Sequence, residues 1–418
     1  MFFFYQILIF IALIFSPLIL LTRFFKDKED KKRFIEKFSI INKEKNKNNL
    51  VWIHAASVGE VMSVVPLIDE LEKNQKIKKI LLTTSTLSSS KIFSNFNFKR
   101  TIHQFFPIDF FLLTPIFINH WKPKIAIFVD SEIWPCMYKN IKRENIPLIL
   151  LNARITEKSF NKWRALKKFS TDVFSHIDVA YPSNQETIKY LKKFKVKKIK
   201  KIGNLKFSQR HKIKKEKFSK SFLFSIKNRC IWVASSTHPN EEEIIAKAHL
   251  RLKKEFKNLL TVIIPRHVNR VKEITDNLET LHLKTIIRTS KQKIKSDTDI
   301  YLVDTFGETK KFFELSKTTF IGGSLANHGG QNPIEPASFG LNIIHGPHVR
   351  NFKDIFKLFA EKKISHEIKN VNQLLNIARK LLKKNNKINL NLREMGNSIL
   401  KKTVIEVNNI LNNEIKKT

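Results

Sequence analysis

A glycine-rich stretch late in the chain, Gly322 to Gly340, has the residue types of a loop that holds an anionic ligand. Four of the chain's ten glycines lie within residues 322–330, where they allow tight turns and a close approach of backbone to ligand. Asn332 then has the character of an N-cap, with Pro333 at the first helical position and Glu335 at the third. A helix that begins there offers free N–H groups and a partial positive charge to a phosphate, and Glu335 could accept a sugar hydroxyl.

The alternative for this stretch is a plain glycine-rich turn with a capping pair. We favour the ligand-binding interpretation because other polar clusters follow predicted strands and point to the same region. The sequence contains no GxxxxGK[ST] motif, so it gives no support to a Walker-type ATPase.

The segment HAASVGEV allows two interpretations of Glu60. Ser57 and Glu60 have the spacing of a capping box, in which Glu60 would only bond backbone N–H groups. In the other interpretation Glu60 is a general base. A helix N-terminus lowers the pKa of a carboxylate and weakens it as a base, so the geometry would have to compensate. The spacing alone leaves both open.

Three further segments supply candidate ligand contacts. Arg266 and His267 follow an apolar run in PRHVNR. An arginine suits a bidentate contact with phosphate, and the alternative is an arginine on the surface without a ligand. Lys206, in GNLKFS, lies where the two halves of the chain join. In THPNEEE we interpret the glutamates as the acidic first turn of a helix, and Thr237 or His238 could still contact a ligand.

The spacing of histidines and cysteines predicts no metal site. His54 and His238 are isolated, and the chain has neither an H-x-x-x-H nor a C-x-x-C pattern. Only Cys136 and Cys230 are present, which fits a reducing compartment and excludes a disulfide scaffold.

Two series of short apolar runs must position these residues. The runs are VWIHA, KILLTTS, KIAIFVD, PLILLNA and DVAYPS in the first half, and CIWVASS, LLTVIIPRH, KTIIRTS, DIYLVDT, TTFIGGS and LNIIHGP in the second. Such continuous runs are typical of parallel strands that are buried on both faces. Helical stretches such as residues 61–71, with apolar residues on one face, lie between them. We therefore predict an α/β protein with two βα domains.

A basic, turn-rich break in this alternation sets the domain boundaries. We predict domains at residues 30–205 and 221–395, a linker at 206–220 and a C-terminal helix at 396–418. In open α/β sheets ligands bind outside the carboxyl ends of the strands, and nearly every polar cluster here follows a predicted strand. Two such rims that face each other predict a small-molecule cleft between the domains.

Residues 1–25 predict a membrane anchor helix. They carry no charged side chain before Arg23, and an apolar run of this length can cross roughly 30 Å of hydrocarbon. The run lacks the basic start and the cleavage site of a signal peptide. The basic segment that follows indicates a cytoplasmic body. The alternative is a helix on the membrane surface, which Pro17 favours.

The net charge of +40, from 77 Lys and Arg against 37 Asp and Glu, also has two interpretations. It is either a compositional bias spread over solvated helices or a sign of a partner with phosphates, such as nucleic acid or an anionic membrane. The charge is diffuse, so the sequence leaves both open. A hydrophobic content of 42% is enough for packed cores and excludes a disordered chain.

Taken in order, eight segments resemble the 3-deoxy-D-manno-octulosonic acid (Kdo) transferases of Gram-negative bacteria. The segments are HAASVGE, SEIWP, NARITEKS, GNLKF, THPNEEE, PRH, VDTFGE and HGGQNPIEPA. The resemblance runs from about Trp52 to Phe352, and the N-terminal hydrophobic segment resembles that of the family as well. Each motif is weak alone, but eight in order are specific.

The resemblance implies a metal-independent glycosyltransferase of GT-B fold, with two Rossmann-like domains that face each other across a cleft. It implies that the first domain binds the acceptor and the second the CMP-sugar. The donor would be CMP-Kdo and the acceptor the lipid A precursor (lipid IVA) of lipopolysaccharide biosynthesis, with inversion at the anomeric carbon and no cofactor. The implied partners are these substrates and the inner membrane, without nucleic acid. The implied location is the cytoplasmic face of that membrane.

The resemblance also implies roles for single residues. Glu60 matches the general base that deprotonates the acceptor hydroxyl, and Lys206 matches a position thought to stabilise the transition state. Asp130 stands where the family pattern E-T-E-x-W-P has its first glutamate, with a shorter side chain, and we expect it to keep a supporting catalytic role; Glu132 is retained. The stretches that hold CMP match Arg266, His267, Phe306, Gly307, Glu308, Asn332, Pro333, Ile334 and Glu335.

Two other functions stay open at this point. A nucleotide-sugar epimerase of GT-B architecture would need neither a lipid acceptor nor an anchor, and release of CMP only in the presence of lipid A precursor would exclude it. A non-catalytic, basic, membrane-tethered protein that binds anionic lipid or nucleic acid predicts steep salt-dependent binding and no specific affinity for CMP.

Overall fold

The computed structural model describes most of the chain. The described stretches are residues 1–43, 49–209, 218–384 and 391–417. The predicted linker at 206–220 therefore lies partly outside the described residues.

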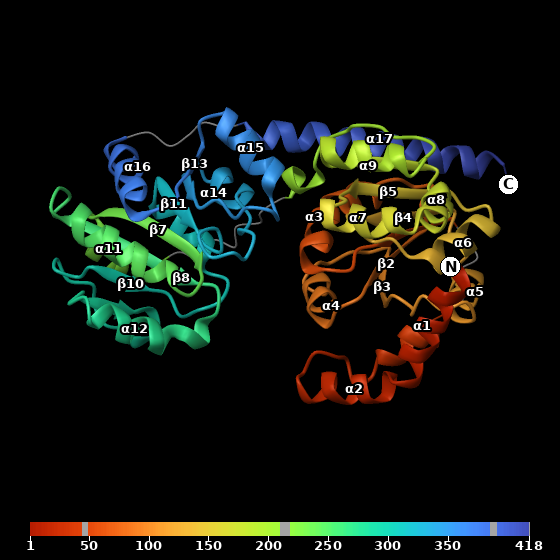
Figure 1. Cartoon of the computed structure of the whole chain (residues 1–418), viewed down its shortest axis with the longest axis horizontal. Helices are drawn as coiled ribbons and strands as arrows, with labels where there is room; N and C mark the ends of the chain where they lie inside the picture. Colours follow the sequence, from red (N-terminus) through yellow and green to blue (C-terminus); the bar gives the residue numbers. More distant parts are fainter. Residues whose placement is uncertain (44–48, 210–217, 385–390, 418) are drawn as a thin grey trace. The chain divides into compact units, whose positions relative to one another are not determined.

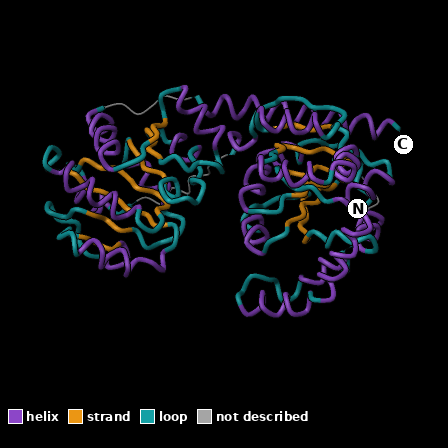
Figure 2. The backbone as a smooth tube through the Cα atoms, viewed as in Figure 1, coloured by secondary structure: helices purple, strands orange, loops and turns teal. Residues whose placement is uncertain are grey.

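The chain forms two compact units, each built on one parallel sheet (Figure 1). Unit 1 comprises Met1–Arg210 together with Arg393–Thr418, and unit 2 comprises His211–Leu392. In both units helices flank the strands (Figure 2). The prediction of an α/β protein with two parallel-sheet domains is confirmed.

The sheet of unit 1 has six strands in the order β3-β2-β1-β4-β5-β6, which is the strand order of Rossmann dinucleotide-binding folds. The strands are β1 (Leu50–His54), β2 (Lys79–Thr84), β3 (Thr101–Phe105), β4 (Ile125–Val129), β5 (Leu148–Ala153) and β6 (Val179–Pro182). The helices between them are α3 (Val58–Leu71), α4 (Leu87–Phe93), α5 (Leu113–Trp121), α6 (Pro135–Arg143), α7 (Glu157–Ala165), α8 (Lys167–Ser175) and α9 (Gln185–Lys193). Every residue of β1, β4 and β5 is buried, as expected for strands covered on both faces.

The sheet of unit 2 has seven strands in the order β13-β12-β11-β7-β8-β10-β9. The strands are β7 (Cys230–Thr237), β8 (Leu259–Pro265), β9 (Thr285–Ile287), β10 (Ile300–Leu302), β11 (Thr318–Ile321), β12 (Asn342–His345) and β13 (Ser365–Glu367). The helices are α10 (Lys220–Ile226), α11 (Glu241–Lys253), α12 (Val271–Glu279), α13 (Thr309–Leu315), α14 (Ile334–Ser338), α15 (Lys353–Glu361) and α16 (Val371–Lys383), with short 3-10 turns η3 (Val268–Arg270) and η4 (Arg288–Ser290). The polar loops that follow β7, β8, β10 and β11 leave the sheet at one edge, because all strand pairs are parallel.

Each core contains a buried tryptophan on its first strand. Trp52 donates its ring N–H to Thr83 Oγ1 at 2.9 Å, and Trp232 donates to Thr261 Oγ1 at 2.7 Å. Both rings are fully buried, so truncating either to alanine is expected to cost roughly 3–5 kcal/mol of stability. The hydroxyl partner is required because a buried polar group without a hydrogen bond is costly.

The C-terminal helix α17 (Leu392–Lys416) packs on unit 1, although the residues that precede it in the sequence belong to unit 2. Glu406 accepts a hydrogen bond from the Tyr181 hydroxyl at 2.8 Å and pairs with Lys200 Nζ at 2.7 Å. A Cβ at Gly396 would lie 2.2 Å from the carbonyl oxygen of Phe207, so a residue without a side chain is needed there. The chain thus returns to unit 1 after completing unit 2.

The N-terminal segment forms two helices, not the single anchor helix that was expected. They are α1 (Phe2–Ile14) and α2 (Ser16–Phe25), bent by 53° at their junction. Pro17 lies in the first turn of α2, where proline is tolerated but cannot continue a preceding helix. Among the described residues no helix alone has the length and apolarity to cross a membrane, and only this bent pair meets the criterion jointly.

Candidate active site

The loops after β1 and β4 bring three carboxylates together in unit 1. These strands are neighbours in register, with His54 paired to Phe128, so their carboxyl ends open side by side. Glu60 lies in the first turn of α3, directly after β1, and Asp130 and Glu132 lie directly after β4.

Glu60 forms the capping arrangement and also has the properties of a base. Ser57 Oγ donates to Glu60 Oε1 at 2.7 Å, and the Ala56 N–H donates to Oε2 at 2.8 Å. Burial raises the pKa of Glu60 to about 7, and the negative charges of Glu132 and Asp130 add to the rise, while the bonds from Ser57 and Ala56 act against it. The helix terminus was expected to lower this pKa, but burial and two like charges outweigh it. A carboxylate with a pKa near the ambient pH is suited to general base work.

Asp130 and Lys206 form an ion pair beside Glu60. Lys206 Nζ lies 3.1 Å from Asp130 Oδ2, and both side chains are largely buried. Ser131 Oγ donates to the other oxygen of Asp130 at 3.0 Å. Asp130 has a φ of 62°, a left-handed conformation that aspartate tolerates better than most residues. Despite its shorter side chain, Asp130 therefore still reaches the cation.

The backbone around Lys206 is held by two asparagines. Lys206 lies in the 3-10 helix η2 (Leu205–Ser208), and its N–H donates to Asn204 Oδ1 at 3.0 Å. Asn152, at the end of β5, accepts from the Leu205 N–H at 2.9 Å. Asn152 is buried and has a φ of 53°. Sequence reasoning did not single it out; the signal was an asparagine at a strand end, in the NARITEKS motif.

His54 is also part of this site, although it looked isolated in the sequence. Its Nε2 lies 3.2 Å from Glu132 Oε2, and its Nδ1 lies 3.0 Å from Thr83 Oγ1. The ring is fully buried and stacks on Phe106 at 3.9 Å. The ring N–H of Trp134 donates to the same Glu132 oxygen at 2.9 Å. Glu132 is therefore fixed in place, and its charge acts on Glu60.

Unit 2 gathers three histidines at the carboxyl edge of its sheet. The ring of His238, after β7, stacks on His328 at 4.3 Å and meets His267 edge-on at 6.0 Å. Burial, together with the charges of His328, His267, Arg266 and Arg270, lowers the pKa of His238 to about 4. The His238 ring is thus neutral at pH 7 in cationic surroundings.

Two buried polar atoms at this edge have no hydrogen-bond partner among the described residues. They are Thr237 Oγ1 and His238 Nε2. Buried polar groups are nearly always bonded, so unsatisfied ones at a strand end are candidates for ligand contacts. Both belong to the segment in which sequence analysis allowed a contact.

The loop after β10 carries the predicted residues Phe306, Gly307 and Glu308. Phe306 is 78% exposed, and Gly307 has a φ of 83°. Burial by itself would raise the pKa of Glu308, but hydrogen bonds from Arg288, Thr305 and Lys311 lower it to about 2. Glu308 is therefore an ionised carboxylate that braces the loop, whereas Phe306 offers an open ring face.

The helix after the glycine-rich loop begins one residue later than predicted. Pro333 takes the N-cap position, and α14 has five residues from Ile334 to Ser338. The Asn332 side chain accepts from the Ile334 N–H at 3.0 Å, so it still satisfies the helix start. Glu335 lies in the first turn, with Lys310 Nζ 3.5 Å from its Oε1.

The glycines of this loop are required by the backbone. A Cβ at Gly322 would lie 2.2 Å from the Ser236 carbonyl oxygen. Gly329 and Gly330 have φ values of 85° and 71°, which favour glycine. The contact at Gly322 is with the protein's own backbone, so the close approach of this loop to a ligand stays a prediction.

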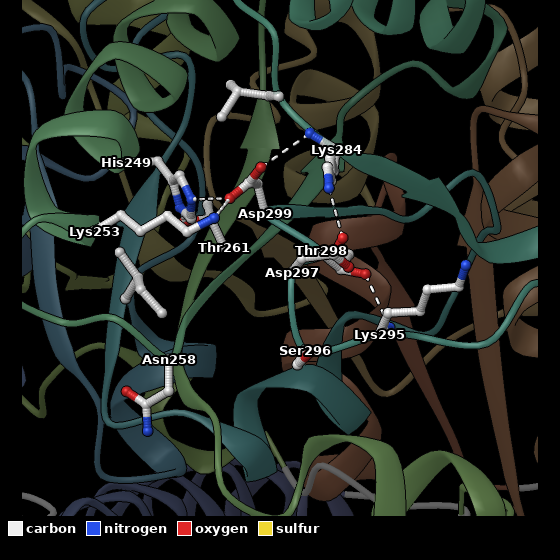
Figure 3. Close-up of polar contacts among 12 residues, drawn as sticks. His249, Lys253, Asn258, Thr261, Lys284, Lys295, Ser296, Asp297, Thr298 and Asp299 are labelled. Atoms are coloured by element: carbon white, nitrogen blue, oxygen red, sulfur yellow. Dashed lines mark hydrogen bonds and ion pairs between the residues drawn. The ribbon is translucent and has the colours of Figure 1, made fainter.

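A second polar cluster of unit 2 lies at the other end of the sheet (Figure 3). Asp299, which precedes β10, contacts Lys253 Nζ, lies 3.2 Å from His249 Nε2 and accepts from the Lys284 N–H at 2.9 Å. His249 Nδ1 lies 2.8 Å from Thr261 Oγ1. Burial opposes ionisation of Asp299, but these bonds lower its pKa overall. The cluster ties α11 to the sheet at the amino ends of the strands, away from the edge where ligands bind.

The predicted site residues thus form two groups, one in each unit. Glu60, Asp130 and Lys206 converge in unit 1. The residues predicted to hold CMP lie along the loops after β8, β10 and β11 in unit 2. The buried, unsatisfied atoms of Thr237 and His238, where the sequence allowed a ligand contact, lie at the end of β7 and directly after it. Within the described ranges no three His, Cys, Asp or Glu side chains are grouped as a metal ion would need.

Known proteins resemble this chain in sequence and in fold. Residues 32–209 match a family described as 3-deoxy-D-manno-octulosonic-acid transferase (kdotransferase). A protein of that name from Rickettsia bellii is 34% identical over 383 residues, covering 91% of each chain. Its counterpart from Haemophilus influenzae is 32% identical over 316 residues, covering 74% of each. A UDP-GlcNAc 2-epimerase structure from Neisseria meningitidis covers 87% of this chain and all of its own, with a TM-score of 0.60 at 12% identity. That last likeness shows a GT-B-like fold and nothing more.

Proposed function

This chain belongs to the Kdo transferase family and is a glycosyltransferase, and from that premise we propose its substrates and mechanism. The donor is CMP-Kdo, bound by unit 2, and the acceptor is the lipid A precursor (lipid IVA), bound by unit 1. The observation that carries the proposal is Glu60, a carboxylate with a raised pKa beside the Asp130–Lys206 ion pair.

Glu60 acts as the general base. Its carboxylate takes the proton of the acceptor hydroxyl while the hydroxyl oxygen attacks the anomeric carbon of Kdo. The bond from that carbon to the CMP phosphate breaks, and CMP leaves with the electron pair. Attack on the face opposite the leaving group inverts the anomeric carbon. A base with a pKa of about 7 is half ionised at neutral pH and still takes up a proton readily.

Fixed charges and donors stabilise the departing CMP. Lys206 is oriented by Asp130 and stabilises negative charge that develops in the transition state. In unit 2, Arg266 suits the phosphate, and the unsatisfied atoms Thr237 Oγ1 and His238 Nε2 supply further hydrogen bonds. The exposed ring of Phe306 is available to stack on the cytosine ring of CMP.

The remaining predicted residues complete the donor pocket. They lie in the loops after β8 and β10 and at the start of α14, where we propose that the nucleotide binds. These residues are His267, Gly307, Glu308, Asn332, Pro333, Ile334 and Glu335.

The α1–α2 segment attaches the enzyme to the cytoplasmic face of the inner membrane. Phe2, Tyr5 and Gln6 hold α1 to the body: the Tyr5 hydroxyl donates to buried Asp109 at 2.7 Å, and Gln6 Oε1 accepts from the Phe111 N–H at 3.0 Å. The other side of the α1–α2 segment is apolar and exposed. Part of α5 and the two residues before it, Phe111 and Leu112, add to this apolar surface. The exposed side chains include Phe3, Phe4, Leu8, Ile11, Phe15, Leu18, Leu21, Phe25, Phe111, Leu112 and Ile116. This arrangement favours a segment that lies in the membrane interface.

The α2 end of the segment is also tied to the body. Buried Glu29 pairs with Arg23 at 2.9 Å and with Lys37 at 2.6 Å, and the rings of Phe24 and Phe34 meet edge-on at 5.3 Å. A helix pair that is fastened at both ends supports an interfacial attachment more than a free spanning helix.

The proposal is tested by mass spectrometry of the product from CMP-Kdo and a tetra-acylated, bisphosphorylated disaccharide. We expect the acceptor mass to rise by one or more Kdo residues, with one CMP released per residue, only when both substrates are present. The Glu60→Ala variant should bind CMP normally in a calorimetric titration but turn over about a hundredfold more slowly or worse. Unchanged acceptor mass, or near-normal turnover by this variant, would contradict the proposal.

The two alternative functions lose their support. Relatives at 32% and 34% identity are Kdo transferases, whereas epimerase structures share only the fold. A non-catalytic binder does not explain a carboxylate with a pKa of about 7 next to a buried ion pair.

A further inference from the structure

Glu241 has an unusual set of partners for a helix-start glutamate. It is 1% exposed, and its carboxylate accepts hydrogen bonds from five backbone N–H groups. Oε2 accepts from His238 at 2.9 Å and from Gly323 at 2.7 Å. Oε1 accepts from three successive residues, Ser324 at 3.1 Å, Leu325 at 2.9 Å and Ala326 at 3.2 Å.

These contacts do more than cap α11. Only the bond to His238 is local; the other four reach the loop after β11, more than eighty residues further along the chain. A buried carboxylate is stable only when hydrogen bonds replace its lost hydration, and here the loop amides supply most of them. The shape of residues 323–326 and the position of the Glu241 carboxylate therefore depend on each other.

The loop of residues 323–326 is packed closely against its neighbours, so its shape determines where the His238 side chain lies. A Cβ at Gly323 would lie 3.1 Å from His238 Cδ2 and 3.2 Å from its Nε2. On the other side, Ser324 Oγ accepts from the Gly346 N–H at 2.8 Å, and the Ser324 carbonyl accepts from the His348 N–H at 2.9 Å. A shift of this loop would thus move His238, together with the His328 ring that stacks on it.

We propose that Glu241 is a positioning residue that fixes the Gly323–Ala326 loop and, through it, the His238 edge in the arrangement that receives the CMP-sugar. The proposal rests on the donor-binding function proposed for unit 2. Glu241 touches no reacting atom; it acts through the loop. The acidic run THPNEEE is therefore not only a helix start, because its first glutamate also organises the donor edge.

The direct test is hydrogen–deuterium exchange on the full chain, followed by mass spectrometry. In the wild type the amides of residues 323–326 should exchange about as slowly as those of β11. In Glu241→Gln the new NH₂ group faces N–H donors, so the same amides should exchange about tenfold faster or more, with β8 unchanged. The matched control is Glu243→Gln, in the same turn, where the native partner is Lys247 on the same helix.

Steady-state kinetics then separate positioning from a general loss of stability. We expect Glu241→Gln to raise KM for CMP-Kdo by about tenfold while KM for the lipid acceptor changes less than about twofold. Glu243→Gln should change neither. If Glu241→Gln does not fold, Glu241→Asp, which keeps the charge with a shorter reach, carries the same comparison.

The outcomes separate this proposal from the function on which it rests. Fast exchange of residues 323–326 in the wild type, or equal loop exchange in the Gln variants at 241 and 243, overturns it. A loosened loop with an unchanged KM for CMP-Kdo overturns the link to the donor. If the wild type binds no CMP-Kdo, the donor function fails, whereas the exchange result on the loop still stands by itself.

Discussion

Glu60 combines the contacts of a helix cap with a raised pKa, which suits the role of base proposed for it. Its two oxygens accept from Ser57 Oγ and from the Ala56 N–H, which holds the carboxylate in one orientation. Burial and the charges of Glu132 and Asp130 then disfavour ionisation. The capping bonds hold the carboxylate and the neighbouring acids raise its pKa, so the capping role is compatible with the proposed role as a base.

We predict that kcat/KM rises with pH through about 7. We also predict that the midpoint of this rise moves to lower pH in Glu132→Gln. Transfer needs ionised Glu60, so kcat/KM should increase as pH passes its pKa of about 7. Removing the negative charge of Glu132 makes ionisation of Glu60 easier, so the midpoint should move to lower pH. The measurement is kcat/KM against pH for the wild type, Glu132→Gln and the control Glu70→Gln, at the far end of α3.

The sign for stability is opposite to the sign for activity. Glu60 has a folded pKa above its ordinary value of 4.5, so folding favours its protonated form. Its contribution to the free energy of unfolding is fully present below pH 4.5 and is lost as pH rises through about 7. For the activity profile, the contradicting outcome is a midpoint of kcat/KM against pH that is unchanged or higher in Glu132→Gln. That result would show that Glu132 does not raise the pKa of Glu60.

The residues that sequence analysis missed act through other residues. His54 and Asn152 have ordinary types for a strand end, and nothing in their spacing announces a partner. Their roles depend on contacts with Glu132, 78 positions away, and with Leu205, 53 positions away. Motif residues were recognisable because each motif is local, whereas these contacts exist only after the sheet is formed.

At the scale of elements, most strands were predictable because parallel strands are continuous apolar runs. All five apolar runs predicted for unit 1 are strands. β3 (Thr101–Phe105) and β13 (Ser365–Glu367) were missed because they lie at sheet edges and mix polar with apolar residues. The start of α14 was misplaced by one residue because Asn332 satisfies the first N–H from outside the helix.

We predict that substitutions at Asn152 separate backbone strain from the support of η2. Both Asn152→Ala and Asn152→Gly leave the Leu205 N–H without its acceptor, at a cost of about 1–3 kcal/mol. At a φ of 53°, alanine should cost about 1 kcal/mol more than glycine. Because the same bond positions Lys206, turnover should fall about tenfold to a hundredfold in both variants.

The measurements are denaturant unfolding and kcat for both variants. The control is Asn184→Ala, which removes the N-cap of α9, where Asn184 accepts from the Thr187 N–H at 2.8 Å. It should lower stability by about 1 kcal/mol with normal turnover. Normal turnover in Asn152→Gly would mean that the bond to Leu205 does not position Lys206.

At the scale of the whole molecule, the net charge of +40 and the exposed apolar α1–α2 segment both favour binding to a membrane. They act differently, because attraction to anionic lipid is screened by salt, whereas burial of apolar side chains is not. In the sequence, the diffuse charge left open both a compositional bias and a partner with phosphates. The fastening of α1 to the body could not be read from the sequence, because Tyr5 and its partner Asp109 lie 104 positions apart.

We predict that a Phe3→Ser/Leu8→Ser/Ile11→Ser variant loses salt-resistant membrane binding. The three side chains are exposed, so the variant should fold normally, and Tyr5 and Gln6 still hold α1 to the body. Each side chain contributes up to about 1.5–3 kcal/mol when fully buried in an apolar phase. Even partial insertion of three should weaken vesicle binding by about tenfold or more.

The measurement is co-sedimentation with vesicles of zwitterionic lipid, with and without anionic lipid, at low and high salt. The wild type should bind anionic vesicles at low salt and keep part of this binding at high salt. The triple variant should keep only the salt-sensitive part, which comes from lysines and arginines. The control Phe224→Ser removes an aromatic side chain of unit 2 that is 80% exposed and should bind as the wild type does. If the triple variant binds as strongly as the wild type at high salt, α1 is not the element that enters the membrane. The next residues to substitute would then be the exposed apolar ones in and just before α5, namely Phe111, Leu112 and Ile116.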